Sequence, residues 1–147
     1  MPWCTAAATP FLSLILNNVD FTFAPILRGS STAGSLWVSL HTGALSAGSD
    51  QTTNEVPATG GYARLEVARN SGSPLWTVTG NVANPAAILA WSELTAGASS
   101  ATHAAIGTAA TGAGVVIVSG ALNNPIPIQA GVTPRLGTGT AFTLPTS

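Results

Sequence analysis

The stretch LWVSLHTGALSAGSDQTTNEVPATGGYARLEVAR, residues 36–69, decides the fold class of this chain. At both ends of the stretch, apolar residues alternate with polar or aromatic ones. Alternation with a period of two is typical of a β-strand that buries one face. The stretch therefore predicts strands over 36–41 and 62–67, joined by a long polar loop over 43–61 that is either functional or a packing arm.

Further short strands are expected along the rest of the chain, separated by Gly and Pro. They are predicted near 75–79, 87–91, 102–108, 115–118, 126–129 and 140–144. The run 115–118 shows no alternation, which favours a strand covered on both faces. Pro125 and Pro127 favour an edge strand, because proline cannot donate to the ladder. These patterns predict an all-β fold, a β-sandwich or jelly roll.

One short helix is predicted near the N-terminus. Thr9-Pro10 is typical of a helix start, and apolar residues at helical spacing follow it over 10–19, with Asn17-Asn18 at the exit. Residues 1–9 would form an apolar arm whose Trp3 docks onto a neighbouring subunit. The whole chain, 1–147, is expected to be a single domain.

The composition is nearly free of charge. Only 6% of residues are charged and the formal net charge is -1, whereas free domains carry a net charge of about 2 to 8 in magnitude. This favours a protein that works inside an assembly; a neutral surface rich in Ser and Thr is the alternative. Four scattered arginines predict no direct nucleic-acid binding. No apolar run approaches the length of a membrane span, so no membrane partner is expected, and the single Cys4 is expected to be a free thiol.

The histidines do not predict a metal site. His41, His103 and the nearby acids Asp50 and Glu55 match no known ligand spacing. Both histidines fall in predicted strands, where a hydrogen-bonded structural imidazole is the ordinary outcome. No metal and no cofactor is expected.

An enzyme is also not expected. Glycoside hydrolysis would need two facing carboxylates, for which Glu55 and Glu66 are the best pair. Glu66 shares a predicted strand face with Arg64, so a salt bridge or rim contact explains it more simply. No Gly-x-Ser-x-Gly turn anchors a serine nucleophile.

Exposed aromatic and polar residues suggest an interface instead. Trp76 and Trp91 follow apolar neighbours and are predicted to lie in the core, whereas Trp37 lies opposite the apolar face of its strand. Polar residues of the 43–61 loop suit hydrogen bonding to another backbone. The interface candidates are Trp3, Trp37, Gln51, Asn54, Glu55, Tyr62 and Arg64.

Several short motifs carry a resemblance that covers most of the chain. They are Leu40-His41-Thr42, Asn54-Glu55-Val56, Gly61-Tyr62-Ala63-Arg64, Ala101-Thr102-His103-Ala104-Ala105-Ile106-Gly107 and Val118-Ser119-Gly120-Ala121-Leu122. With them the sequence resembles a small tailed-phage virion protein family often labelled "tail fibre protein". The resemblance implies a structural protein of the virion, assembled in the host cytoplasm.

Two structural roles follow from this resemblance. The main hypothesis is a capsid cement or decoration protein that binds the major capsid protein, because a chain of this length without repeat or heptad cannot form a long fibre. The alternative is a tail-associated protein, a fibre, adaptor or receptor-contacting subunit that binds tail proteins. A polysaccharide-degrading enzyme is a third hypothesis. In each structural role the chain is expected to be a homo-oligomer, possibly a trimer.

Overall fold

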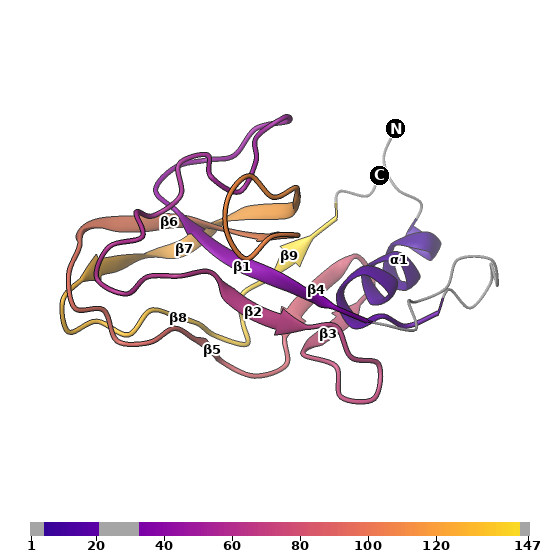
Figure 1. Cartoon of the computed structure of the whole chain (residues 1–147). Helices are drawn as coiled ribbons and strands as arrows, with labels where there is room; N and C mark the ends of the chain where they lie inside the picture. Colours follow the sequence, from indigo (N-terminus) through magenta and orange to yellow (C-terminus); the bar gives the residue numbers. More distant parts are fainter. Residues whose placement is uncertain (1–4, 21–32, 145–147) are drawn as a thin grey trace. The chain divides into compact units, whose positions relative to one another are not determined.

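The computed structural model describes residues 5–20 and 33–144. These residues divide into two compact units, one made of 5–20, 33–35, 67–87 and 137–144 and the other of 36–66 and 88–136. Each unit is described by itself below, and Figure 1 gives the labels of the elements. The expectation of a single domain over 1–147 stays a prediction.

The first unit packs a helix against a small antiparallel sheet of strand order β3-β4-β9. Its elements are α1 (Thr5–Asn17), β3 (Trp76–Thr79), β4 (Val82–Pro85) and β9 (Phe142–Thr143). Strands β3 and β9 fall within predicted stretches, while β4 was not predicted. Its sequence VANP ends in proline and has no alternating apolar pattern.

Helix α1 begins five residues earlier than predicted. Thr9 does not cap its start; the Thr9 hydroxyl donates a hydrogen bond to the Gly80 carbonyl at 2.6 Å, and Pro10 lies inside the helix. The alanine-rich residues 6–8 have high helix propensity, which extends the helix toward the N-terminus. The expected arm over 1–9 is therefore partly helical, and residues 1–4, including Trp3, lie outside the described residues.

The exit of α1 lies where the sequence predicts it. Asn18 adopts a positive φ of 57°, and its N–H donates to the Leu14 carbonyl while the Val19 N–H donates to that of Ser13. This left-handed residue after the last turn satisfies carbonyls that the helix itself leaves free. Arg69 supports the same end, because its guanidinium donates to the carbonyls of Leu14 and Ile15.

The core of the first unit forms between α1 and the sheet. Leu12 and Leu16, one helical turn apart, are buried together with Trp76 and Phe142. The two rings meet edge to face with centroids 5.5 Å apart, a favoured aromatic geometry. The Asn17 amide donates to the Trp76 carbonyl at 2.8 Å, which ties the helix end to β3. The prediction that Trp76 is a core residue is confirmed.

The second unit is built on an antiparallel sheet of order β2-β1-β6-β7, in which β2 crosses the unit boundary after Glu66. A two-stranded sheet pairs β5 with β8. The bounds are β1 (Ser35–His41), β2 (Leu65–Ala68), β5 (Leu89–Ala90), β6 (Ala98–Gly107), β7 (Val116–Gln129) and β8 (Arg135–Leu136). The predicted strand over 62–67 starts only at Leu65, since residues 62–64 belong to the loop.

Strands β1 and β6 form the buried centre of this sheet. Val38 pairs with Ile106 and Leu40 with Ala104, and all four side chains are buried. Trp91 is also buried, as predicted, and its indole N–H donates to the Ala63 carbonyl at 2.9 Å. Strand β1 lies between β2 and β6, so backbone hydrogen bonds on both of its edges hold it in place.

Strand β7 differs from its sequence prediction in two ways. The segments near 115–118 and 126–129 belong to one strand, and Pro125 and Pro127 lie on an edge strand as expected. The expectation that 115–118 is covered on both faces is wrong, because Val115 is 68% exposed. A run of β-branched residues indicates a preference for extended backbone, but it does not by itself show that the side chains are buried.

The fold class predicted from the sequence is confirmed. The described residues form several antiparallel sheets and a single short helix near the N-terminus, an all-β arrangement of the sandwich-like class. Between β1 and β2 the chain forms turns and isolated bridges, including His41 with Glu55 and Asp50 with Val115. These bridges position the 43–61 loop against the sheet of the second unit.

Candidate functional site

The end of β1 carries a buried histidine that holds the loop. His41 has no exposed surface. Its Nδ1 lies 2.8 Å from the Thr53 carbonyl oxygen and its Nε2 lies 2.8 Å from the Ser39 hydroxyl. A carbonyl only accepts, so Nδ1 carries the proton and Nε2 accepts from Ser39. The expected structural imidazole is confirmed at this position.

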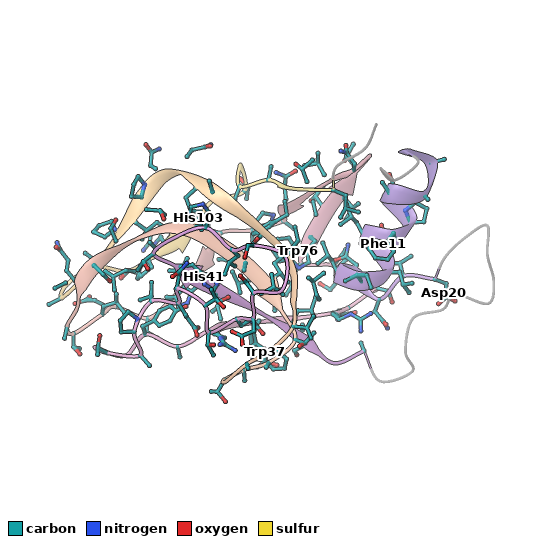
Figure 2. The ribbon with its side chains drawn as sticks, turned by 90° about the horizontal axis from the view of Figure 1, so that it is seen from above. Phe11, Asp20, Trp37, His41, Trp76 and His103 are labelled. Atoms are coloured by element: carbon teal, nitrogen blue, oxygen red, sulfur yellow. The ribbon has the colours of Figure 1, made fainter. Side chains whose placement is uncertain are left out.

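Burial lowers the pKa of His41 below its ordinary value, mainly by desolvation, and the hydrogen bond to the Thr53 carbonyl opposes this only in part. The residue is therefore neutral at neutral pH. His103 lies directly opposite it on β6, half-buried, with the Thr102 hydroxyl 2.9 Å from its Nδ1. Figure 2 shows both histidines on their neighbouring strands.

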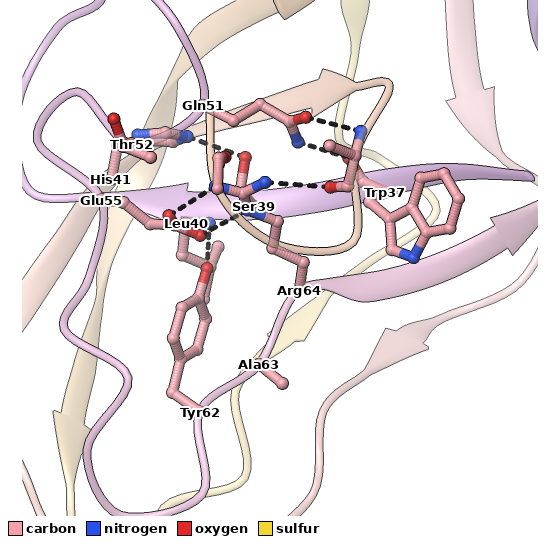
Figure 3. Close-up of polar contacts among 12 residues, drawn as sticks. Trp37, Ser39, Leu40, His41, Gln51, Thr52, Glu55, Tyr62, Ala63 and Arg64 are labelled. Atoms are coloured by element: carbon pink, nitrogen blue, oxygen red, sulfur yellow. Dashed lines mark hydrogen bonds and ion pairs between the residues drawn. The ribbon is translucent and has the colours of Figure 1, made fainter. Parts of the chain in front are cut away.

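The buried Gln51 joins the 43–61 loop to the second unit's sheet through backbone and side-chain hydrogen bonds. Its backbone N–H donates to the Gly114 carbonyl at 3.0 Å, its Oε1 accepts from the Ala109 N–H at 2.9 Å, and its Nε2 donates to the Trp37 carbonyl at 3.4 Å (Figure 3). The side chain has no exposed surface. A Cβ on Gly107 or Gly114 would collide with it. Glycine at both positions is therefore what makes room for the Gln51 side chain.

Arg64 joins the loop to the turn between β6 and β7. Its guanidinium makes a bidentate ion pair with the Glu55 carboxylate, at 2.7 and 2.8 Å. It also donates to the carbonyls of Ala109 and Gly112, at 2.9 and 2.8 Å. The Arg64 side chain is 3% exposed and that of Glu55 is 18% exposed. The fork of donors suits a carboxylate and carbonyls at once, and Glu55 further raises the pKa of Arg64.

This geometry corrects the expected pairing of Arg64 with Glu66. Arg64 lies before β2 rather than inside it, so the two residues do not share a strand face. The loop instead returns Glu55 to Arg64. Arg64 is thus a nearly buried internal residue, not part of an exposed rim.

Tyr62 adds a further contact between the chain that follows the 43–61 loop and strand β1. Its hydroxyl accepts a hydrogen bond from the Leu40 N–H at 2.8 Å, and only 4% of the residue is exposed (Figure 3). Burial raises the pKa of Tyr62, so the phenol stays protonated. The ring therefore acts as a strut between the loop and the middle of β1.

A pocket of about 320 Å³ opens above this cluster. Its walls are formed by Thr52, Glu55, Val56, Pro57, Ala58, Tyr62, Arg64, Ala110, Thr111 and Gly112. Because Glu55 and Arg64 neutralise each other, the pocket presents no isolated charge. Threonine hydroxyls and small apolar side chains remain, which suit contact with a neutral surface better than proton transfer or metal binding.

The interface candidates are placed differently from one another. Gln51, Tyr62 and Arg64 have buried side chains with partners inside the unit, so their expected direct contact with another protein is not supported by their positions. Trp37 is half-buried and Asn54 is exposed. The Asn54 amide donates to the Ala44 carbonyl at 3.1 Å, and its φ of 53° marks a turn.

Sequence reasoning missed the residues that receive these side chains. Gly107 and Gly114 leave space for Gln51, and the carbonyls of Ala109 and Gly112 accept from Arg64. The Gly112-Ala113-Gly114 turn was a visible signal, although it indicated only a turn. Among residues 5–20 and 33–144, no group of three or more potential metal ligands comes together. No helix in the same ranges has both the length and the apolar character to cross a membrane.

Comparison with known families decides what kind of protein carries this site. A family model described as "Podophage GP4 fiber I protein gp80" matches residues 5–143. The chain belongs to this family. Membership in a fibre family makes it a structural protein of tailed phages and a component of the virion, as the resemblance to tail fibre proteins implied. No curated protein matches the chain.

Replacing Arg64 tests the internal role of the ion pair. Arg64→Met should lower the free energy of unfolding by about 2 kcal/mol or more, because it strands the Glu55 carboxylate and two carbonyls. Arg135→Met is the matched control, since Arg135 is exposed, and should change stability by less than about 0.5 kcal/mol. Urea unfolding measures both. Equal stability of the two variants would contradict the internal role.

A methyl group placed in the space that Gly107 and Gly114 leave for the Gln51 side chain should also destabilise the unit. Gly114→Ala is expected to cost about 1–3 kcal/mol, because the new methyl group overpacks a site occupied by Gln51 and Ala109. Gly139→Ala serves as the control, since a Cβ there meets no atom within 4 Å. Thermal unfolding of both variants compares them. A Gly114→Ala protein as stable as the control would show that this space adapts freely.

The buried His41 predicts acid sensitivity. Its pKa is lowered in the folded state, so the unfolded chain takes up a proton first as the pH falls below the ordinary histidine pKa of 6.5. The contribution of the neutral His41 to the free energy of unfolding is therefore fully present above that pH. Below it, the free energy of unfolding declines by at most about 1.4 kcal/mol per pH unit for one proton. His41→Gln should flatten the dependence of unfolding free energy between pH 7.5 and 5.5 (roughly the histidine range), whereas His103→Gln should retain it. The reverse result would assign the effect to His103.

Proposed function

We propose that this chain is a tail-associated structural subunit, part of the fibre apparatus through which a tailed phage contacts its host. The observation that carries the proposal is the match of residues 5–143 to a family described as a fibre protein. The match spans nearly the whole described chain, including both units. It therefore concerns the protein as a whole rather than a shared module.

The tail hypothesis is preferred here to the capsid-cement hypothesis. Cement was favoured from sequence because the chain is short and lacks a shaft repeat. These properties are equally compatible with a subunit that attaches to a tail or decorates a fibre, and the family description names a fibre. We therefore take tail proteins as the expected partners, in place of the major capsid protein.

We also propose that the subunit acts by binding, without catalysis. The acid best placed in the pocket, Glu55, has both carboxylate oxygens engaged by Arg64. With both oxygens held by the guanidinium, the carboxylate is oriented toward Arg64 and not toward a ligand in the pocket. The pocket lining of Thr52, Thr111 and small apolar residues offers contact surface instead.

Multiple copies are the expected working form. The net charge is -1 and two of the four arginines, Arg64 and Arg69, spend their donors inside the chain. Little charge is left to keep neighbouring copies apart, and interface cores are depleted in charge. The homo-oligomer expected from the sequence therefore remains part of the proposal.

Immunogold electron microscopy of intact virions tests the location. Antibody fragments against this chain should label the tail region, and quantitative gels should give a copy number comparable to that of other tail proteins. Antibody against the major capsid protein is the control for accessible heads. Labelling distributed over the head, with copies in proportion to the major capsid protein, would reject the tail assignment in favour of cement.

A further inference from the structure

The 43–61 loop is joined to the end of β1 by a short backbone contact that has His41 at its centre. The His41 Nδ1 donates to the Thr53 carbonyl at 2.8 Å. Two backbone hydrogen bonds, of 2.8 and 2.9 Å, flank the imidazole and join residues 40–42 to residues 54–56. The loop can therefore leave β1 only by uncovering the imidazole.

The imidazole is shielded from water in this arrangement. His41 has no exposed surface, and neither has Ser39, whose hydroxyl donates to Nε2 at 2.8 Å (Figure 3). The neutral ring thus has a partner at each nitrogen. A proton added to Nε2 replaces an acceptor with a donor, so the Ser39 hydroxyl can no longer donate to it. The charged ring would also lose its hydration.

The charged groups that face His41 replace this hydration only in part. From the loop, Glu55 attracts a positive imidazole, but both of its oxygens are bonded to Arg64. The charge of Arg64 repels the imidazole. From β6, His103 lies directly opposite and repels it as well when charged.

The other titratable groups of the neighbouring elements are neutral or bonded elsewhere. Asp50 uses its carboxylate for hydrogen bonds within its own turn. Tyr62 accepts from the Leu40 N–H and stays protonated. Residues 94–134, which include β6 and β7, contain no Asp, Glu, Lys or Arg. Water is therefore the environment that best stabilises a charged His41.

We propose that protonation of His41 releases the 43–61 loop from the end of β1 while the rest of the sheet stays folded. The charged ring reaches water once residues 53–56 separate from the strand. His41 is the last residue of β1, so the ring can turn outward without breaking pairs further along the strand, such as Val38 with Ile106. Local opening of this kind costs less free energy than global unfolding.

Protonation and opening favour each other. Desolvation lowers the pKa of His41 while the loop is closed, whereas an imidazole in water has its ordinary pKa. The closed loop is therefore fully stable above the ordinary pKa, and the open form binds the proton first as the pH falls below it. The opening equilibrium then rises by at most about tenfold per pH unit for one proton.

Opening of the loop would also remove one wall of the pocket, because its lining residues between 52 and 58 belong to this loop. The contact surface is then complete when His41 is neutral and incomplete when His41 is charged. This consequence rests on the proposed binding role of the pocket, whereas the release of the loop does not depend on that role.

Amide hydrogen exchange, followed by mass spectrometry on the full chain, tests the proposal. From about pH 7.5 to about pH 5.5, across the histidine range, protection of residues 51–56 should fall about tenfold after correction for the intrinsic exchange rate. At the lower pH these residues should exchange at least about tenfold faster than 104–106 of β6. Low urea should accelerate exchange only in β6, which opens by global unfolding. Equal protection of the two segments would overturn the proposal.

The two histidine variants assign the effect, since the sequence contains only these two histidines. His41→Gln should abolish the fall in protection of 51–56, and the matched control His103→Gln should retain it. Far-UV circular dichroism checks the fold of each variant, and His103→Gln alone decides if His41→Gln does not fold. A fall that persists in folded His41→Gln, or disappears in His103→Gln, would overturn the proposal. Head labelling of virions together with acid release of the loop would reject the tail assignment alone.

Discussion

The insertion of Gln51 between two glycines is the contact on which the second unit depends. One side chain reaches the carbonyl of Trp37 on β1 and the N–H of Ala109 beyond β6. Both are partly buried backbone groups, for which losing the partner costs more than an exposed hydrogen bond contributes. Closing a long loop carries an entropy cost, and the insertion of Gln51 is one of the interactions that offset it.

Two further anchors hold the same loop from other directions. His41 bonds the Thr53 carbonyl, and Arg64 bonds Glu55 together with the turn at 109–112. Each anchor comes from a different part of the chain, so the loop is constrained on several sides by polar contacts. This affects the surface as well, because the ion pair of Arg64 with Glu55 takes two of the chain's few charged groups away from it.

The sequence predicts conformation and burial correctly where they depend on residues that are close together in the chain. The strand over 36–41, the helix exit at Asn17-Asn18 and the burial of Trp76 follow from local periodicity and turn chemistry. The buried and neutral His41 was also foreseen as structural. In each case the pattern extends over several adjacent residues, which makes the local signal strong.

Contacts that depend on chain reversal could not be read in the same way. Arg64 pairs with Glu55, nine residues earlier in the chain, and not with Glu66, two residues later. Two glycines with positive φ, Gly60 and Gly61, lie between Glu55 and Arg64 where the chain reverses. Gln51 was taken for an exposed polar residue because its sockets, Gly107 and Gly114, lie far along the chain. Helix α1 extended past Pro10 because alanine propensity outweighed a start signal.

The absence of charge acquires a physical meaning once these contacts are known. Arg64, Arg69 and Glu55 bond inside the chain, so few charged groups are left for contact with a partner, and backbone, hydroxyls and apolar surface gain in importance. On β7 the exposed side chains at 119–121 are small, so they offer little specificity themselves. The bridge at Val115 and the prolines at 125 and 127 interrupt the edge of this strand, and such features oppose uncontrolled addition of further strands.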